Sequence, residues 1–234
     1  MPVHRTAFGT GVLAMVLLTG CVAYPPPKVI MANEVTRIEI RRDTRAARPH
    51  THPATFAPET MRALLSGMRI QVQTDRFMGV VNGWSERHPV FTAADLAAIA
   101  GPLADALTQA APNDIVTFYR RVSDGSAGLA FITGGVFVQD GLAYVVMANF
   151  WSLPVDAMVP AVPSYMIDPI DQPLLTLGRK FYRLSHAQEQ ADVHLPEWQE
   201  RHPGDKTLVV NLALLHPESK PVVPRTSSEP RSKP

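Results

Sequence analysis

Cysteine is almost absent from this chain of 234 residues, which contains a single one, at position 21. One cysteine cannot form an internal disulfide, and it cannot supply a zinc site of four cysteines or of two cysteines and two histidines. A lone thiol in an exported protein is unusual unless some other chemistry uses it.

The chain also lacks an excess of charge of either sign. It carries 22 Lys and Arg against 21 Asp and Glu, a formal net charge of +1. Domains that bind nucleic acid are as a rule strongly basic, so this balance argues against a nucleic-acid partner. With 46% hydrophobic and 18% charged residues, the composition is typical of a globular protein.

The signature motifs of common enzymes are missing as well. The sequence contains neither of the phosphate-binding glycine patterns GxxxxGK[ST] and GxGxxG, and it contains no GxSxG or HExxH. We therefore predict a non-catalytic protein that uses no cofactor and no metal.

The clearest apolar run, residues 7–18, is 12 residues long. A helix needs about 20 apolar residues to cross a bilayer, so this run is too short to span one. It follows a short segment that carries Arg5, and a positive segment before a short apolar run is typical of a secretory signal. The sequence thus predicts export.

An aliphatic residue and two small ones, Leu18, Thr19 and Gly20, directly precede Cys21. This pattern resembles the lipobox of bacterial lipoproteins. The resemblance implies cleavage before Cys21 and a diacylglyceryl group on its thiol, which anchors the chain to a membrane. An ordinary secretory leader or an uncleaved anchor is the alternative. Val22, where some lipoproteins carry Asp, implies the outer membrane with the domain facing the periplasm; the inner membrane and the cell surface stay open.

Proline marks both ends of the expected mature chain. Pro25, Pro26 and Pro27 favour a stiff polyproline spacer, and five prolines in 217–234 with few apolar residues favour a disordered tail. We divide the chain into a signal peptide (1–20), a membrane tether (21–29), a periplasmic domain (30–216) and a C-terminal tail (217–234).

Hydrophobic periodicity indicates the elements of the domain. Residues 35–42 alternate, which predicts a half-exposed strand with Thr36, Ile38 and Ile40 facing the core and Arg37, Glu39 and Arg41 facing solvent. Residues 92–111 show a helical stripe, capped by Thr92 with Asp95 and kinked or split at Pro102. Further helices are expected from Pro58 and across 186–202, and further strands from Ile70 and at 115–122, 129–132, 136–138, 142–148, 177–184 and 208–215.

These elements predict one α+β domain with a mainly antiparallel sheet and packed helices. Asp140-Gly141 between apolar runs predicts a tight hairpin. The segment 208–215 is almost wholly apolar, which predicts a central strand.

Residues 152–175 combine five prolines with apolar side chains. Such a long irregular segment in a compact domain is often functional. It follows Phe150 and Trp151, whose rings should point to opposite faces of a strand. One ring is then free for a partner, unless both rings and the loop cap the core. The residues of this possible partner surface are Phe150, Trp151, Met158, Tyr165 and Met166.

Three other groups of polar residues are interpreted as structural. His50 and His52 could place two imidazoles on one side of an extended segment, but a polar surface loop explains them better. Residues 123–126, with His88 or His186, contain the residue types of a hydrolase, yet Ser, Asp and Gly are turn formers first. Asp168 and Asp171 are interpreted as solvated loop acids.

The leading hypothesis is a lipid-anchored envelope protein that binds a partner protein or supports an envelope assembly. The alternative is a binding module for a small apolar molecule, lipid or glycan, seated between the sheet and the 152–175 segment. A hydrolase with an unrecognised site is the third possibility.

Overall fold

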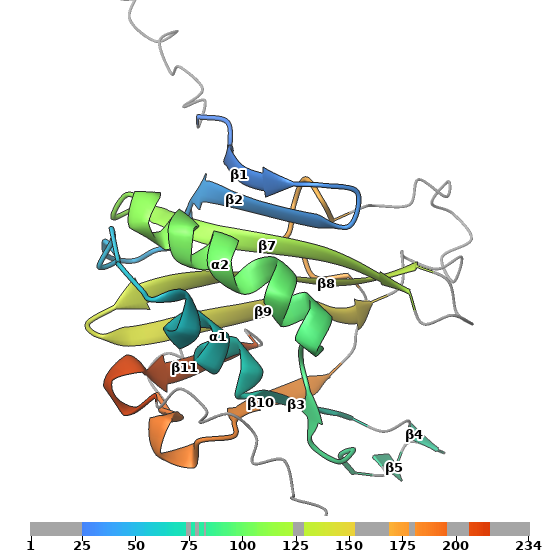
Figure 1. Ribbon diagram of the computed structural model, residues 1–234. Helices are drawn as coiled ribbons and strands as arrows, with labels where there is room; N and C mark the ends of the chain where they lie inside the picture. Colours follow the sequence, from blue (N-terminus) through green and yellow to red (C-terminus); the bar gives the residue numbers. More distant parts are fainter. Residues whose placement is uncertain are drawn as a thin grey trace, which may run out of the picture.

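The computed structural model describes residues 25–73, 76–77, 80–81, 83–123, 129–152, 169–177, 181–195 and 206–215. Its largest part is a six-stranded sheet in which every neighbouring pair is antiparallel. Figure 1 shows the strands in the order β1-β2-β7-β8-β9-β11. The strands are β1 (Lys28–Ala32), β2 (Thr36–Arg42), β7 (Asp114–Ser123), β8 (Leu129–Gln139), β9 (Leu142–Ser152) and β11 (Thr207–Asn211).

Two smaller antiparallel sheets accompany the main one. The first has the order β10-β3-β6, and the second is a two-stranded pair. Their strands are β3 (Met68–Val72), β4 (Arg76–Phe77), β5 (Val80–Val81), β6 (His88–Pro89) and β10 (Tyr182–His186). The expectation of mainly antiparallel sheet is confirmed.

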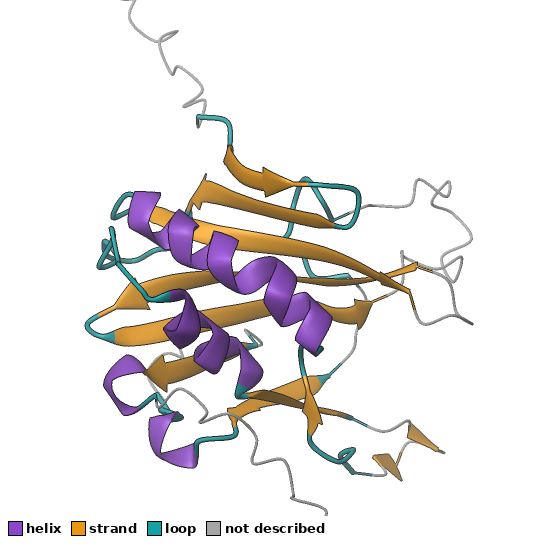
Figure 2. Cartoon of the chain, viewed as in Figure 1, coloured by secondary structure: helices purple, strands orange, loops and turns teal. Residues whose placement is uncertain are grey.

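Two α-helices lie across the same face of the main sheet, as Figure 2 shows. The first, α1 (Pro58–Ser66), starts at the expected proline, whose missing N–H costs nothing at a helix start. The second, α2 (Ala93–Gln109), starts with the predicted capping box, in which Thr92 and Asp95 each bond the other's backbone N–H. Helix α2 continues through Pro102 as one helix, so the predicted split is wrong.

The helix-covered face holds the main core. Leu65 of α1 and Leu103 and Leu107 of α2 share one cluster of buried side chains with Val136 and Val145 of the sheet. Burying such aliphatic side chains stabilises a fold by about 1.5–3 kcal/mol each. Among the described residues, no helix is long and apolar enough to pass through a membrane.

Strand β8 is one continuous strand, whereas the sequence predicted two short ones separated by Gly134-Gly135. The glycines are accommodated because neighbours come close: a side chain on Gly134 would overlap the Val146 carbonyl oxygen. The hairpin between β8 and β9 is confirmed. Asp140 and Gly141 both have positive φ, 53° and 77°, as a two-residue turn of this kind requires.

The second face of the main sheet is also covered, which the sequence analysis did not expect. Phe137 and Tyr144 stack there with centroids 4.7 Å apart, and Leu174 packs against their cluster. Leu177 packs with Tyr119 and Phe131 in a further cluster. The prediction that Glu39 faces solvent is therefore wrong: its side chain is 1% exposed.

Two predictions for the C-terminal third are also wrong. Strand β11 lies at an edge of the sheet rather than at its centre. It is apolar because both of its faces are buried, Val210 in the main core and Val209 on the second face. In the described part of 186–202, the predicted helix is reduced to a 3-10 turn, Glu189–Ala191.

Candidate functional site

A chain of charged side chains runs along β2 on the second face of the sheet. Arg37, Glu39 and Arg41 alternate with core residues, so all three point to the same side. Glu39 forms an ion pair with each arginine. Its Oε1 pairs with Nε of Arg37, and its Oε2 lies 2.7 Å from Nε and 2.5 Å from Nη2 of Arg41. A buried carboxylate thus holds two guanidinium groups. We call these three residues the β2 arginine cluster.

The two arginines are held differently. Nη1 of Arg41 donates to the backbone oxygen of Asp171 at 2.7 Å, which ties this arginine to the segment that covers the second face. Among the described residues, Arg37 finds a hydrogen-bond acceptor only for its Nε. Within the part of the chain that the structure describes, no group accepts a hydrogen bond from its terminal amino groups, and its side chain is 29% exposed.

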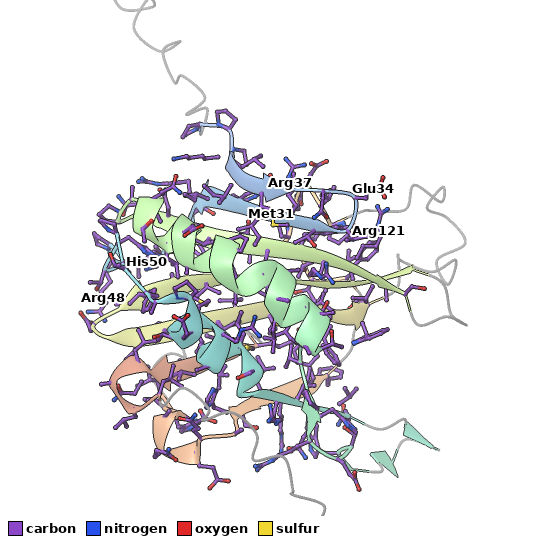
Figure 3. The ribbon with its side chains drawn as sticks, viewed as in Figure 1. Met31, Glu34, Arg37, Arg48, His50 and Arg121 are labelled. Atoms are coloured by element: carbon purple, nitrogen blue, oxygen red, sulfur yellow. The ribbon has the colours of Figure 1, made fainter. Side chains whose placement is uncertain are left out.

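The neighbours of Arg37 on the adjoining strands differ in size. On the outer side it pairs with Ala32 of the edge strand β1, and on the inner side with Tyr119 of β7. The hydroxyl of Tyr119 also accepts from Nε of Arg121 at 3.3 Å. Figure 3 shows Arg37 and Arg121 with Glu34 toward the end of the sheet where β1 turns into β2.

The Arg-Glu-Arg alternation is visible in the sequence, where it predicts a face exposed to solvent. The missing information was the cover that residues 169–177 give to the second face. An acid between two bases at alternate positions is the signal that could have pointed to this cluster.

The predicted partner residues Phe150 and Trp151 lie near the end of β9. Both are partly buried and both pack against the main core, so the two rings do not alternate as expected. Trp151 has a φ of 45°, and the register of β9 shifts nearby, which removes the regular alternation of side chains. Met158, Tyr165 and Met166 lie outside the described residues.

Phe150 lies in a small group of side chains that also includes the Tyr182 ring and the Lys206 ammonium group. The rings of Phe150 and Tyr182 are 6.4 Å apart in a T-shaped arrangement, and Nζ of Lys206 lies 3.7 Å above the Tyr182 ring. The Tyr182 hydroxyl donates to the Met147 carbonyl at 2.7 Å. Burial raises the pKa of Tyr182 and lowers the pKa of Lys206 to about 8. No pattern in the sequence joins these residues, because they come from three separate strands or strand ends.

His50 and His52 do not lie in a surface loop, and that interpretation is wrong. Both residues are buried, each with 6% of its surface exposed. His50 stacks on Phe137 at 4.2 Å, and its Nε2 donates to Asp43 at 3.1 Å. Burial would raise the pKa of Asp43, but the hydrogen bonds from His50 and from the Arg45 backbone outweigh it, so the pKa is lowered.

His52 is the least satisfied of these groups. Neither of its ring nitrogens has a hydrogen-bond partner among the described atoms. Burial and the neighbouring His50 lower the pKa of His52 to about 4, against a weaker opposing effect of Asp114. In the described ranges, no three His, Cys, Asp or Glu side chains gather as metal ligands.

The described residues that were considered for a hydrolase site lie on different elements of the fold. Both ring nitrogens of His186 bond to the backbone, Nε2 to the Leu64 carbonyl and Nδ1 to the Gln188 N–H. His88 is exposed on β6, and Ser123 is the last residue of β7. Asp171 is exposed. Asp168, residues 124–126 and Cys21 lie outside the described residues.

Comparison of this chain with protein-family models, with curated proteins and with solved structures finds no match.

Proposed function

We propose that this chain is a lipoprotein of the bacterial envelope, anchored through Cys21, whose domain binds a partner protein or supports an envelope assembly without catalysing a reaction. The observation that carries the proposal is the run Leu18-Thr19-Gly20-Cys21 after a short apolar segment, in a chain with no other cysteine. The proposed site is the outer membrane, with the domain in the periplasm.

The position of the first strand supports a role close to the membrane. Strand β1 begins at Lys28, seven residues after Cys21. Seven residues span at most about 25 Å even when fully extended. An anchor on Cys21 would therefore keep the start of β1, at one edge of the main sheet, within this distance of the lipid.

We further propose that residues 30–216 form one α+β domain with the helices packed on the sheet. Support comes from the main core, which takes side chains from both helices, from five strands of the main sheet and from β3 and β10. Strand β1 begins two residues before this range.

The proposed partner surface is the one predicted from the sequence, around Phe150 and Trp151. Two features favour it. Both aromatic side chains are only partly buried, and aromatic residues are enriched in protein interfaces. Lys206 adds a cation beside them at the Tyr182 ring.

The anchor is tested on the protein purified from membranes. Mass spectrometry should find an N-terminal Cys21 that carries acyl chains, and Cys21→Ala should move the protein out of the membrane fraction. A mature chain that begins before residue 21, or a Cys21→Ala variant that stays in the membrane, would contradict the proposal.

The partner surface is tested by photo-crosslinking in cells, with a crosslinking residue in place of Trp151. The matched control places it at Thr108, an exposed position on α2. We expect a discrete protein adduct from position 151 and none from position 108. The same adducts from both positions, or none from either, would exclude a partner at this surface.

A further inference from the structure

We infer that the β2 arginine cluster is a binding site for a phosphate group, with the terminal amino groups of Arg37 as the main donors. Binding of phosphate does not depend on the proposed anchor. Only the origin of the phosphate, a lipid headgroup rather than a free ion, rests on the proposed function.

The guanidinium group of Arg37 is oriented by Glu39. Its Nε is bonded to the buried carboxylate of Glu39, which fixes the plane of the guanidinium group. Nη1 and Nη2 keep four N–H donors in that plane, and the side chain is 29% exposed. An arginine with a fixed plane and an available fork loses little entropy when it binds an oxyanion.

The charges within the β2 arginine cluster do not balance. Glu39 supplies one negative charge for two guanidinium groups, which leaves an excess of one positive charge in a partly buried place. Glu34, in the turn between β1 and β2, makes no ion pair with a described residue. A bound monoanion, such as the phosphodiester of a lipid headgroup, would balance the positive charge of the cluster.

The neighbour of Arg37 on the edge strand is small. The partner of Arg37 on the edge strand is Ala32, which is exposed and whose side chain is only a methyl group. A phosphate group presents its oxygens to the four donors in a tetrahedral arrangement, whereas a carboxylate presents two oxygens in one plane. If Cys21 is lipidated, the start of this edge strand is held within about 25 Å of the membrane.

The binding experiment uses the purified full-length mature chain in detergent at low ionic strength. Inorganic phosphate is titrated and followed by calorimetry and by the NMR signal of the Arg37 Nε–H, assigned with Arg37→Gln. We expect saturable binding that Arg37→Gln weakens at least about tenfold, a loss of about 1.4 kcal/mol. Arg37→Lys, which keeps the charge but not the fork, should also weaken binding.

The matched control is Arg42→Gln. Arg42 is the exposed next residue of the same strand after Arg41, and the change in net charge is identical. Its affinity for phosphate should stay within about twofold of the parent chain, because Arg42 lies on the opposite face of β2 from Arg37. Equal losses in Arg37→Gln and Arg42→Gln, no saturable binding, or equally tight binding of acetate would each overturn the inference. Unchanged thermal melting shows that the variants are folded.

A second measurement identifies the source of the phosphate. The lipidated chain is placed in nanodiscs that contain either phosphatidylglycerol or phosphatidylcholine alone. If the Arg37 signal reaches its phosphate-bound position only with phosphatidylglycerol, the ligand is an anionic headgroup. If it stays at the free position in both but responds to inorganic phosphate, the site binds a free phosphate. Loss of the anchor is tested separately with Cys21→Ala, so the two proposals fail independently.

Discussion

The imidazole of His186 fills the space beside the α carbon of Gly67, so that a β carbon on Gly67 would overlap its ring atoms. His186 cannot easily retreat, because it is 1% exposed and both of its ring nitrogens bond to the backbone. Gly67 ends α1 and His186 ends β10. This close approach therefore joins the first helix to the smaller three-stranded sheet.

Gly67→Ala should lower the free energy of unfolding by about 1–3 kcal/mol or more, as is usual when a packed interior must take an added group. Urea denaturation measures the loss. Gly101→Ala is the control, since nothing lies within 4 Å of its added β carbon; in the middle of α2 it should be neutral or stabilise by up to about 1 kcal/mol. Equal effects of the two changes would show that the contact with His186 is unimportant.

The buried His52 should make stability depend on pH. Its pKa is lowered from 6.5 to about 4 in the folded chain. Between these values the unfolded chain binds a proton that the folded chain does not, so stability falls as the pH is lowered through this window. The loss amounts to at most about 3 kcal/mol at pH 4.

Chemical denaturation at several pH values between 4 and 7 tests this dependence. His52→Leu should flatten the profile and cost little at pH 7, because it removes a buried group without hydrogen-bond partners. His88→Gln changes an exposed histidine and should leave the profile as it is. If His52→Leu keeps the full slope, another group is responsible.

Glu39→Gln should destabilise the chain by about 2–4 kcal/mol. It leaves the guanidinium groups of Arg37 and Arg41 close together without a charge between them, and removal of one member of a buried ion cluster is costly. Thermal or urea unfolding gives the value. Glu34→Gln, an exposed acid in the turn between β1 and β2, should change stability by less than about 0.5 kcal/mol.

Asp95 links the start of α2 to the main sheet. Oδ2 accepts from the backbone and hydroxyl of Thr92 at 3.0 and 2.7 Å, and Oδ1 accepts from Nη2 of Arg120 at 2.6 Å. Burial would raise the pKa of this carboxyl, but the hydrogen bonds from Thr92 and Arg120 lower it.

Asp95→Ala should therefore cost about 3–5 kcal/mol, since it removes one half of the capping box and leaves the partly buried Arg120 without its acid. Asp105→Ala, on the exposed side of the same helix, should stay within about 0.5 kcal/mol of the parent chain. Unfolding followed by circular dichroism compares the two variants. A small effect at position 95 would mean that Arg120 finds another partner.

Local patterns predicted the elements but not their depth in the fold. The capping box at Thr92, the proline at the start of α1 and the turn at Asp140-Gly141 each involve residues close in sequence, and all three are confirmed. Glu39 and β11 were misplaced because their surroundings come from distant segments. Residues 169–177 cover the face that holds Glu39, and Val193 bonds along the outer side of β11.

The candidate site, like the fold, could be predicted only where it depends on residues that are close in sequence. The alternation of Arg37, Glu39 and Arg41 was visible in the sequence, but the burial of Glu39 depends on chain more than 100 residues away. The group of Phe150, Tyr182 and Lys206 could be predicted only for Phe150, because a cation above an aromatic ring leaves no mark in a single sequence. His50 and His52 were judged by composition, which does not report that an aromatic ring stacks on one of them.

Strand β7 pairs with β2 on one side and with β8 on the other, and this position has a consequence for folding of the chain. Strands β7, β8 and β9 follow one another and can form from local contacts. The pairing of Arg42 with Asp114 must instead close a long loop, which is slower. The hairpin of β1 and β2 thus joins the sheet only after β7 is in place, and a chain in which this step is delayed exposes an unpaired edge to its neighbours.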